Sequence, residues 1–470
     1  MKRLLSVVIL FTLCAVAFAE ETWLGIYMQG QKIGYSSYAT FDGGPTGHPG
    51  KRTESLTVMD SKMLGASLNL RVKSTTYLDS NGRTLQMMVE QESGGRKQTL
   101  DARFGPTTIQ IDLDNGGSKT KRNIPLPKDG AVLDDAVTAL LNGTQIPVGK
   151  KITFYVLDPM TVSLVKNTAT YLGKAKVSVG GKEFDSDEIL IDDPRAATKV
   201  FMSSKGDLIK MEGPLGLEMI PEVKEVAMAV GGGMADLRKD IALATAIKTD
   251  KPIADPWKAS FLKLHVTGLE LDKMKSDEHQ TVRKVEEGWV IEVHPAISSG
   301  RSTIVASAKA QPAWTQPSLH IPSDSLAFRQ LAKKIIGKET AVIPAAKRVK
   351  EYVYSIMTPN AGIGVLRDAS EVLKTKEGVC RDYAILTAAL LRAGRIPAKV
   401  ASGMVYAEGS FYYHAWVEYW DGKHWIGLDS TRPESNFSAT HVKIKDGSVE
   451  QAFQFFVLDG ARIEVVEVHH

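Results

Sequence analysis

One cysteine, one histidine and one aspartate of this chain combine the residue types of a nucleophilic acyl-transfer site. The chain has two cysteines, and only Cys380 lies outside the apolar N-terminal segment. His414 follows it at the start of a strand-like segment, and Asp429 lies beyond a turn signal further on. A thiol, an imidazole and a carboxylate in this order can act as nucleophile, general base and orienting group. We therefore predict these three residues as catalytic.

The thiol is predicted to lie at the start of a helix. Gly378 lets the backbone turn sharply, and residues 380–393 then read as a helix with Gly394 past its end. The positive end of a helix dipole and its free N–H groups favour thiolate over thiol, and the same groups can hold an oxyanion. Asp382 is predicted to be solvated, where its charge partly opposes the thiolate. The helix positions predicted to be buried are Ala384, Ile385, Ala388, Ala389 and Leu391.

The segment 413–420 and the segment 425–429 read as two strands of a hairpin, with the strong turn signal Asp421-Gly422 between them. A two-residue loop would place His414 directly opposite Asp429. A four-residue loop would leave Asp429 a diagonal neighbour on the same face, and a three-residue loop would move it to the other face unless a bulge intervened. Two of these three registers bring the pair together.

Each of these residues has a simpler reading on its own. A lone cysteine is usually a small buried apolar residue, a lone histidine can belong to a core, and an aspartate can cap a turn. The combination at hairpin-compatible spacing favours catalysis. Three nearby tryptophans are expected to pack a core rather than line a cleft: Trp416, Trp420 and Trp425. His469-His470 lacks further ligands, so neither a metal nor a cofactor is predicted.

The N-terminus has the pattern of a secretory signal peptide. Two basic residues, an apolar run at 4–16 and the small-residue site Ala17-Phe18-Ala19 predict a signal at residues 1–19 with cleavage after Ala19. Cys14 could instead be a lipid-attachment site, but the bulky Leu13 before it argues against lipidation. The apolar run is too short to span a membrane. We therefore expect a secreted or periplasmic protein without an integral membrane segment after cleavage.

The charge balance excludes some classes of partner. The chain has a formal net charge of +4, and loss of Lys2 and Arg3 with the signal would lower it to +2 without leaving a basic block. Binding to nucleic acid is therefore not expected. With 470 residues, the chain is long enough for two or three domains that need no disulfide.

The domain organisation follows from a change of pattern along the chain. Residues 20–230 read as short alternating strands, such as 66–72 and 108–113, with one short helix at 134–141, and predict a β-rich domain. Its apolar β surface could dock a protein partner. A glycine- and proline-containing linker is predicted at 231–256, and a small β subdomain or linker at 257–322.

The last part, 323–470, is predicted to be the catalytic domain, with amphipathic helices at 323–336 and 340–357. Its stretches at 378–384, 390–397, 414–418 and 425–431 resemble, in order and spacing, the core of the transglutaminase-like superfamily of papain-related cysteine enzymes. The resemblance is to a secreted member of bacterial type and covers residues from roughly 350 to 460.

The resemblance implies an α+β fold, with a papain-like core of helices packed on an antiparallel sheet behind the β-rich N-terminal domain. It also implies that Cys380 is the nucleophile, His414 the general base and then acid, and Asp429 the residue that holds the imidazole. The family usually reads Asp-Pro-Thr where this chain has Asp429-Ser430-Thr431, a departure that leaves the triad intact. The second oxyanion donor is not assigned, because family members take it from differing residues.

The function implied is that of an exported cysteine enzyme acting on amide bonds of a protein or peptide through a thioester. Water as acceptor gives a peptidase or amidase, and an amine gives a transglutaminase. Hydrolysis is the preferred expectation for a cell-envelope enzyme. The alternative is a non-catalytic binding or assembly module of the cell envelope that uses the same fold as a scaffold. The reactivity of Cys380 distinguishes the two.

Overall fold

The structure, a computed structural model, describes most of the chain. The described residues are 21–45, 49–63, 66–80, 82–116, 118–133, 136–141, 146–194, 197–229, 246–269, 271, 274–298, 300–363, 366–434, 437–452 and 460–470. The predicted signal peptide with Cys14 lies outside them, as does most of the predicted linker. Among the described residues, no helix has both the length and the apolar character to cross a bilayer.

The described residues divide into two compact units. The first takes those up to 229 together with 362 and 363, and the second takes the rest. A large β-rich N-terminal domain, as predicted from the sequence, is therefore confirmed. The boundaries given above for the linker, the small β subdomain and the catalytic domain stay predictions.

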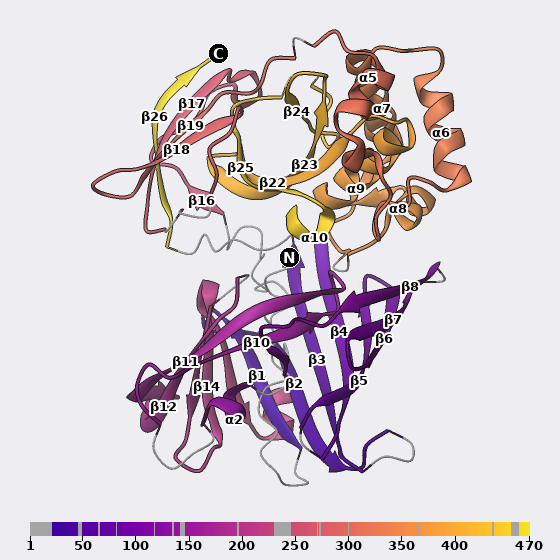
Figure 1. Ribbon diagram of the computed structural model, residues 1–470. Helices are drawn as coiled ribbons and strands as arrows, with labels where there is room; N and C mark the ends of the chain where they lie inside the picture. The colour runs from indigo at the N-terminus through magenta and orange to yellow at the C-terminus, as the bar shows by residue number, and fades with distance from the viewer. Residues whose placement is uncertain are drawn as a thin grey trace. The chain divides into compact units, whose positions relative to one another are not determined.

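One sheet of fifteen strands makes up the first unit (Figure 1). On one side of β1, strands β2 to β8 follow in chain order. On its other side, the strands run backwards from β15 to β9. β9 pairs with β10 in parallel, and the other neighbours are antiparallel. The strands are β1 (Thr22–Met28), β2 (Gln31–Asp42), β3 (Lys51–Met63), β4 (Ala66–Leu78), β5 (Thr84–Ser93), β6 (Arg96–Phe104), β7 (Thr108–Asn115), β8 (Ser118–Pro125), β9 (Ala131–Val132), β10 (Lys151–Asp158), β11 (Ser163–Val179), β12 (Lys182–Asp192), β13 (Thr198–Met202), β14 (Leu208–Gly213) and β15 (Leu217–Glu222). The unit also contains α2 (Ala136–Leu141), η1 (Pro214–Gly216) and α3 (Lys224–Met228).

Alternating burial explains why this part of the chain forms strands. In β7, Ile109, Ile111 and Leu113 are buried, and the residues between them are more exposed. This is the period of two from which the strand at 108–113 was predicted, and the predicted strand at 66–72 is likewise part of β4. The apolar side chains that the sequence marked as a docking surface are thus largely buried, and a partner of this unit stays a prediction.

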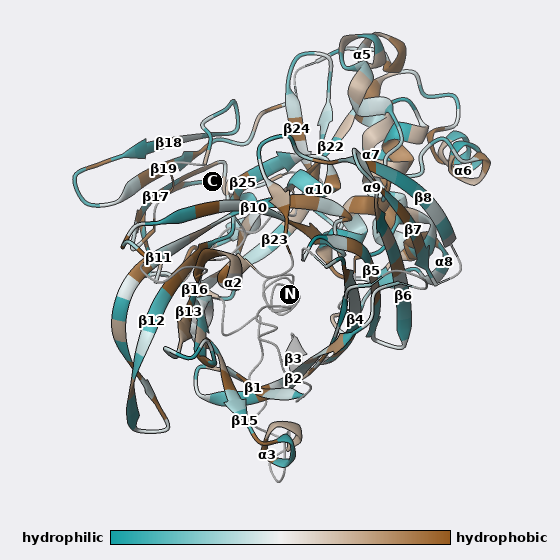
Figure 2. Ribbon diagram, turned by 60° about the horizontal axis from the view of Figure 1, so that its bottom comes forward, coloured by the Kyte–Doolittle hydropathy of each residue, from teal (hydrophilic) through white to brown (hydrophobic). Residues whose placement is uncertain are grey.

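The fifteen-stranded sheet is strongly curved. In Figure 2 its ribbons run from β10 through β15 and β1 round to β8 and describe an open ring. The Arg122 guanidinium of β8 donates to the carbonyl oxygen of Val162, just before β11, at 3.2 Å. A side chain from one end of the strand order therefore reaches the backbone near the other end.

Two antiparallel sheets and a group of helices form the second unit (Figure 1). The larger sheet has the order β16-β23-β22-β25, with β24 also paired to β23. The smaller has the order β18-β19-β17-β26, so the last strand of the chain lies beside β17. Short parallel strands β20 and β21 pair directly before α9. The strands are β16 (Ile247–Lys248), β17 (Phe261–Thr267), β18 (Gln280–Lys284), β19 (Trp289–Val293), β20 (Thr358–Pro359), β21 (Glu377–Gly378), β22 (Ala398–Ala407), β23 (Ser410–Trp420), β24 (Trp425–Leu428), β25 (His441–Gly447) and β26 (Arg462–His469).

Helix α9 is the central helix of this unit. Its side chains from 381 to 392 are buried, and it contacts β22 and β23 as well as the helices α6, α7 and α8. Its bounds agree with the predicted helix, and all five positions predicted to be buried are buried. The helices are η2 (Pro256–Lys258), α5 (Ile304–Ala310), η3 (Pro312–Thr315), α6 (Leu326–Ile336), α7 (Val342–Ile356), α8 (Ala369–Thr375), α9 (Cys380–Ala393) and α10 (Val449–Ala452).

The structure differs from the expected pattern at two places in the helical region. Helix α5 and the turn η3 lie inside the stretch read as strand-like, where the N–H of Ala306 donates to the Thr303 hydroxyl as an N-cap, at 3.2 Å. Gly394 does follow α9, but its backbone is ordinary, at φ −80°, and a Cβ there would displace only Cδ1 of Ile336, which lies 2.3 Å from that position. The left-handed residue after the helix is Arg395, at φ +63°.

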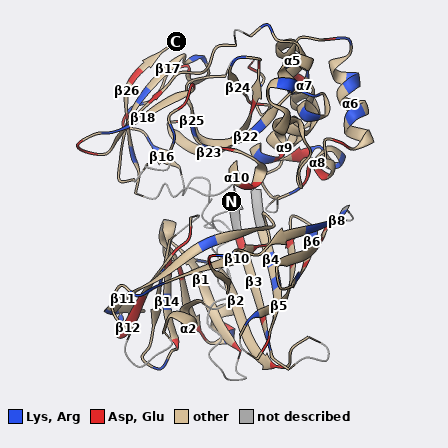
Figure 3. Ribbon diagram, viewed as in Figure 1, with Lys and Arg blue, Asp and Glu red and all other residues tan. Residues whose placement is uncertain are grey.

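A buried ion cluster joins the two sheets of the second unit. The Lys443 ammonium on β25 lies 2.7 Å from Oε1 of Glu418 on β23 and 2.6 Å from Oδ2 of Asp277, which precedes β18. The Lys443 and Glu418 side chains are only 8% and 2% exposed. Elsewhere in both units, basic and acidic residues are interspersed along the ribbons (Figure 3).

Replacement of Lys443 by methionine should lower the free energy of unfolding by about 3 to 5 kcal/mol, because the buried Glu418 then keeps only the more distant Lys399 ammonium, at 3.8 Å, and Asp277 loses its partner. The measurement is urea unfolding followed by tryptophan fluorescence. Lys258→Met is the matched control, because Lys258 and its partner Asp255 are 74% and 68% exposed. The control should change the free energy by less than about 1 kcal/mol. Equal effects of the two replacements would contradict the importance of the cluster.

Candidate active site

Cys380 is the first residue of α9 and is half-buried. Val379 before it has the extended backbone of an N-cap residue, with φ −104° and ψ 176°. The N–H of Val379 donates to Oδ2 of Asp382 at 2.9 Å, so this carboxylate reaches back to close the first turn. The thiol therefore lies at the positive end of the helix dipole, as the sequence predicts.

Close packing requires a glycine just before this turn. A Cβ at Gly378 would lie 2.6 Å from Nη2 of Arg367 and 2.6 Å from the Cβ of Asp382. The sequence attributed Gly378 to a sharp turn of the backbone. The structure adds that two neighbouring side chains occupy the space that any larger residue would need.

The prediction that Asp382 is solvated was wrong. Its side chain is fully buried, and Oδ1 accepts from Nε of the equally buried Arg367 at 3.1 Å. The same guanidinium donates to the hydroxyl of Thr375 at 3.0 Å and to the carbonyl oxygen of Glu377 at 2.5 Å. The positive charge of Arg367 balances the carboxylate, which reduces the opposition to a thiolate that was expected from Asp382.

The hairpin that carries His414 has a four-residue loop. Trp420 pairs with Trp425, so the loop is formed by residues 421–424 and the two-residue register was wrong. The four-residue alternative leaves Asp429 on the same face as His414. Asp429 follows directly after β24, which ends at Leu428.

Asp421 explains the longer loop. This buried side chain accepts from the N–H groups of Lys423 and His424 through Oδ1, both at 2.8 Å. Its other oxygen accepts from the N–H of Gly300 at 3.0 Å. A carboxylate that satisfies three backbone donors favours the wider turn over a tight Asp-Gly turn.

The structure brings the three predicted residues together around one imidazole. Nε2 of His414 lies 2.9 Å from Oδ2 of Asp429, and Cys380 is near enough to the same ring to affect its pKa. Because Nε2 is engaged by the carboxylate, Nδ1 is the nitrogen left for the thiol. The His414 and Asp429 side chains are 12% and 7% exposed. The half-buried thiol and the shielded carboxylate thus both act on this one ring.

Burial disfavours charge on both members of the pair, but their mutual attraction outweighs it. Burial alone would lower the pKa of His414, whereas the charge of Asp429, the hydrogen bond to it and the nearby Cys380 raise that pKa to about 10. The imidazole and its hydrogen bonds likewise overcome burial and hold the pKa of Asp429 well below its usual range. The pair is therefore an imidazolium and a carboxylate at neutral pH.

Asp429 accepts four hydrogen bonds. The N–H and the hydroxyl of Thr431 donate to Oδ1 at 2.9 and 2.7 Å. Nε2 of a second histidine, His441, lies 3.3 Å from Oδ2, the oxygen that also receives His414. Four donors around one buried carboxylate stabilise its charged form.

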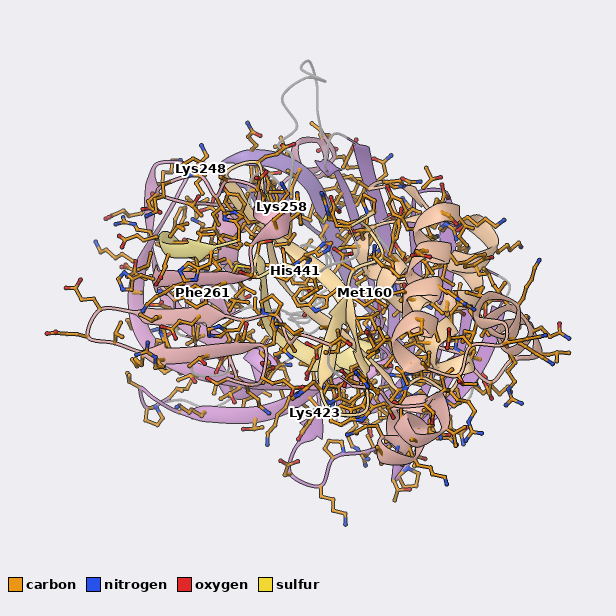
Figure 4. The ribbon with its side chains drawn as sticks, turned by 90° about the horizontal axis from the view of Figure 1, so that it is seen from above. Met160, Lys248, Lys258, Phe261, Lys423 and His441 are labelled. Atoms are coloured by element: carbon orange, nitrogen blue, oxygen red, sulfur yellow. The ribbon has the colours of Figure 1, made fainter. Side chains whose placement is uncertain are left out.

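Sequence reasoning missed His441. It begins β25, separated from Asp429 by a segment without recognisable spacing, and no motif marks it. Only the strand order could have found it, because β25 and β23 both pair with β22. In Figure 4 His441 lies near the middle of the view, away from Lys423 at the turn of the β23–β24 hairpin.

The segment after β24 is attached to two helices. The hydroxyl of Ser430 lies 2.8 Å from that of Thr387 on α9, so the residue that departs from the usual proline links the segment of Asp429 to the helix that begins with Cys380. The buried Lys350 ammonium of α7 donates to the carbonyl oxygens of Arg432 and Glu434 at 2.7 and 2.6 Å. These contacts fix the backbone on which Asp429 lies.

His414, Asp429 and His441 also form the cluster of the described residues that could hold a metal ion, with donor atoms within 4.8 Å of one another. A metal would have to replace both hydrogen bonds to Oδ2 of Asp429. The positive charge of Lys350, which is close enough to interact with Asp429, opposes a second cation there. Both observations favour the hydrogen-bonded arrangement, and the absence of a metal stays a prediction.

Of the three tryptophans, Trp416 packs in the core. It is buried and stacks on His414, with ring centroids 6.3 Å apart and an interplanar angle of 27°. Trp420 and Trp425 lie against each other across the hairpin at 5.5 Å. This agrees with the expectation that these rings pack rather than line a cleft.

Comparisons with known proteins confirm the resemblance seen in the sequence. Residues 329–430 match the model of the transglutaminase-like superfamily, a span that includes Cys380, His414 and Asp429. An uncharacterized protein of Mycobacterium tuberculosis is 27% identical over 131 residues, which are 25% of this chain and 42% of that protein. The chain thus spans less than half the length of this relative.

Two solved structures share a weaker likeness. A candidate cysteine protease from Cytophaga hutchinsonii is 19% identical with a TM-score of 0.31, over 45% of this chain and 87% of the other. A candidate protease from Parabacteroides distasonis is 11% identical with a TM-score of 0.21, over 82% of this chain and 69% of the other. At these scores neither supports an argument about this chain.

The stability that His414 contributes should depend on pH. An unfolded histidine has its pKa near 6.5, and here it is raised to about 10, so the contribution is complete below pH 6.5 and is lost as the pH rises towards 10. The depressed pKa of Asp429 sets the acid limit, because the contribution falls again as the pH drops below about 3.8. The difference in melting temperature between the wild type and His414→Gln should therefore be largest between about pH 4 and 6.5. A difference that is constant up to pH 10 would contradict the ion pair.

Proposed function

Since residues 329–430 form a transglutaminase-like core, we propose that this protein is an exported cysteine enzyme that acts on amide bonds. Cys380 is the nucleophile, His414 the general base and acid, and Asp429 the orienting residue. One observation carries the proposal: the imidazole of His414 lies 2.9 Å from the buried carboxylate of Asp429, and Cys380 is near enough to this ring to help raise its pKa. The contact of α9 with β22 and β23 is consistent with a papain-like arrangement of helix on sheet.

In the first half of the reaction, the Cys380 thiolate attacks the amide carbonyl carbon. Negative charge develops on the carbonyl oxygen, and the positive end of the α9 dipole, where Cys380 lies, favours it. His414, which is protonated near neutral pH because of Asp429, gives its proton to the departing amine. The C–N bond breaks and a thioester with Cys380 remains.

In the second half, His414 accepts a proton from the group that attacks the thioester. Attack by water releases a carboxylic acid and restores the Cys380 thiolate and the His414 imidazolium, which makes the protein a peptidase or amidase. Attack by an amine would form a new amide, as in a transglutaminase. We favour hydrolysis of a protein or peptide in the cell envelope, because water is the more abundant acceptor there.

The first test is the rate at which iodoacetamide alkylates Cys380 at pH 7 in the protein without residues 1–19, where no other thiol competes. The wild type should react at least tenfold faster than His414→Ala, because the imidazolium stabilises the thiolate. His424→Ala, on the same hairpin, is the matched control and should react as the wild type does. A slow reaction that is insensitive to His414 would contradict the catalytic proposal and favour a non-catalytic scaffold.

The acceptor is tested with casein and a fluorescent primary amine. Cleavage of casein into smaller fragments supports hydrolysis. Incorporation of the fluorescent amine into casein supports amine transfer. Cys380→Ala should abolish either activity and keep the melting temperature within a few degrees. If Cys380 reacts rapidly with iodoacetamide but casein is neither cleaved nor labelled, the proposed triad still stands and a different substrate must be tested.

A further inference from the structure

His441 lies across the sheet from His414. The central strand β22 pairs with β23 at Gly403 and His414 and with β25 at Val405 and His441. Gly403 has no room for a side chain, because a Cβ would lie 1.9 Å from the carbonyl oxygen of Val442 and 3.0 Å from the ring of Trp416. The two imidazoles thus come within 5.8 Å of each other, measured between ring centroids.

Both imidazoles point at the same oxygen. Oδ2 of Asp429 lies 2.9 Å from Nε2 of His414 and 3.3 Å from Nε2 of His441. The other oxygen, Oδ1, is occupied by the two donors of Thr431. Thr431 therefore limits rotation of the Asp429 carboxylate through Oδ1, and His441 fixes the direction of Oδ2.

Charge balance assigns different protonation states to the two rings. Burial lowers the pKa of His441, and the positive charge of His414 lowers it further, despite the attraction of Asp429. One carboxylate therefore pairs with one imidazolium, His414, and His441 is neutral. A neutral ring has a single N–H, and a carboxylate is a stronger acceptor than the hydroxyl and carbonyl of Ser438 that face Nδ1. The proton of His441 accordingly belongs on Nε2.

Packing keeps the His441 ring in place. It stacks on Phe437 with ring centroids 4.1 Å apart and an interplanar angle of 29°, and Trp416 packs edge-on against it with centroids 5.4 Å apart. Nε2 of the buried His279, which precedes β18, donates to the carbonyl oxygen of His441 at 2.9 Å. The smaller sheet of the unit therefore supports the backbone of this residue.

We propose that His441 is a positioning residue, which donates from Nε2 to Oδ2 of Asp429 and thereby directs this oxygen at His414. The proposal rests on the function proposed above. His441 does not touch the reacting atoms, and it acts on Cys380 only through Asp429 and His414. A neutral donor is suited to this role because it orients the carboxylate without competing for its charge.

Two replacements separate the hydrogen bond from the packing. His441→Phe keeps a ring between Phe437 and Trp416 but has no donor, whereas His441→Gln places an amide N–H near the position of Nε2 and loses the ring. With iodoacetamide at pH 7, the Phe variant should react about tenfold more slowly than the wild type, the equivalent of one lost hydrogen bond to a charged group. The Gln variant should stay within about threefold of the wild type. A role in packing alone predicts the reverse order.

The outcomes distinguish the two proposals. If Cys380 is alkylated rapidly in the wild type and equally rapidly in His441→Phe, the role of His441 is overturned and the proposed function stays intact. A slow wild type overturns the proposed function and, with it, the role of His441 in directing the triad. Nitrogen-15 NMR of the wild type tests the tautomer without any variant: His441 should show a protonated Nε2 and an unprotonated Nδ1 at pH 7. The opposite tautomer would overturn the donor that the proposal requires.

Discussion

The second unit is organised around the charge of Asp429. An ionised carboxylate away from water is costly unless every lone pair finds a donor. Its donors come from three places in the chain, since His414 lies on β23, His441 on β25, and Thr431 directly after Asp429. Strand order, hairpin register and the segment after β24 must all be correct before these groups meet, so one side chain couples the fold of the sheet to its chemistry.

The position of Cys380 depends on a second buried carboxylate. Asp382 binds the N–H of Val379 and the guanidinium of Arg367, and this pair occupies the space beside Gly378. Helix α9 is therefore held at its first turn by charge and along its length by apolar packing. The contact between Thr387 and Ser430 then ties this helix to the segment that carries Asp429. The segments that carry the thiol and the carboxylate are thus joined by contacts outside the site itself.

Much of this could be read from the residues, and the rest depended on contacts that are distant in sequence. The bounds of α9 follow from local signals, because a glycine before it and apolar spacing within it are short-range. The length of the hairpin loop could not be predicted in this way, because Asp421 stabilises the wider turn partly by accepting a hydrogen bond from Gly300, which is distant in the chain. Asp382 was misjudged because its partner Arg367 lies before α8, and His441 was invisible because only the pairing of β22 with β25 brings it near.

The strand order of the first unit has a consequence for how that sheet can form during synthesis. Strands β2 to β8 and β9 to β14 each pair with neighbours close in the chain, whereas β1 must wait for β15. Pairs such as Trp23 with Glu222 cannot form until almost two hundred further residues have been made. Until then, one edge of β1 offers unpaired backbone groups to any other strand. The growing chain therefore passes through a stage open to misassociation, which ends only when β15 arrives.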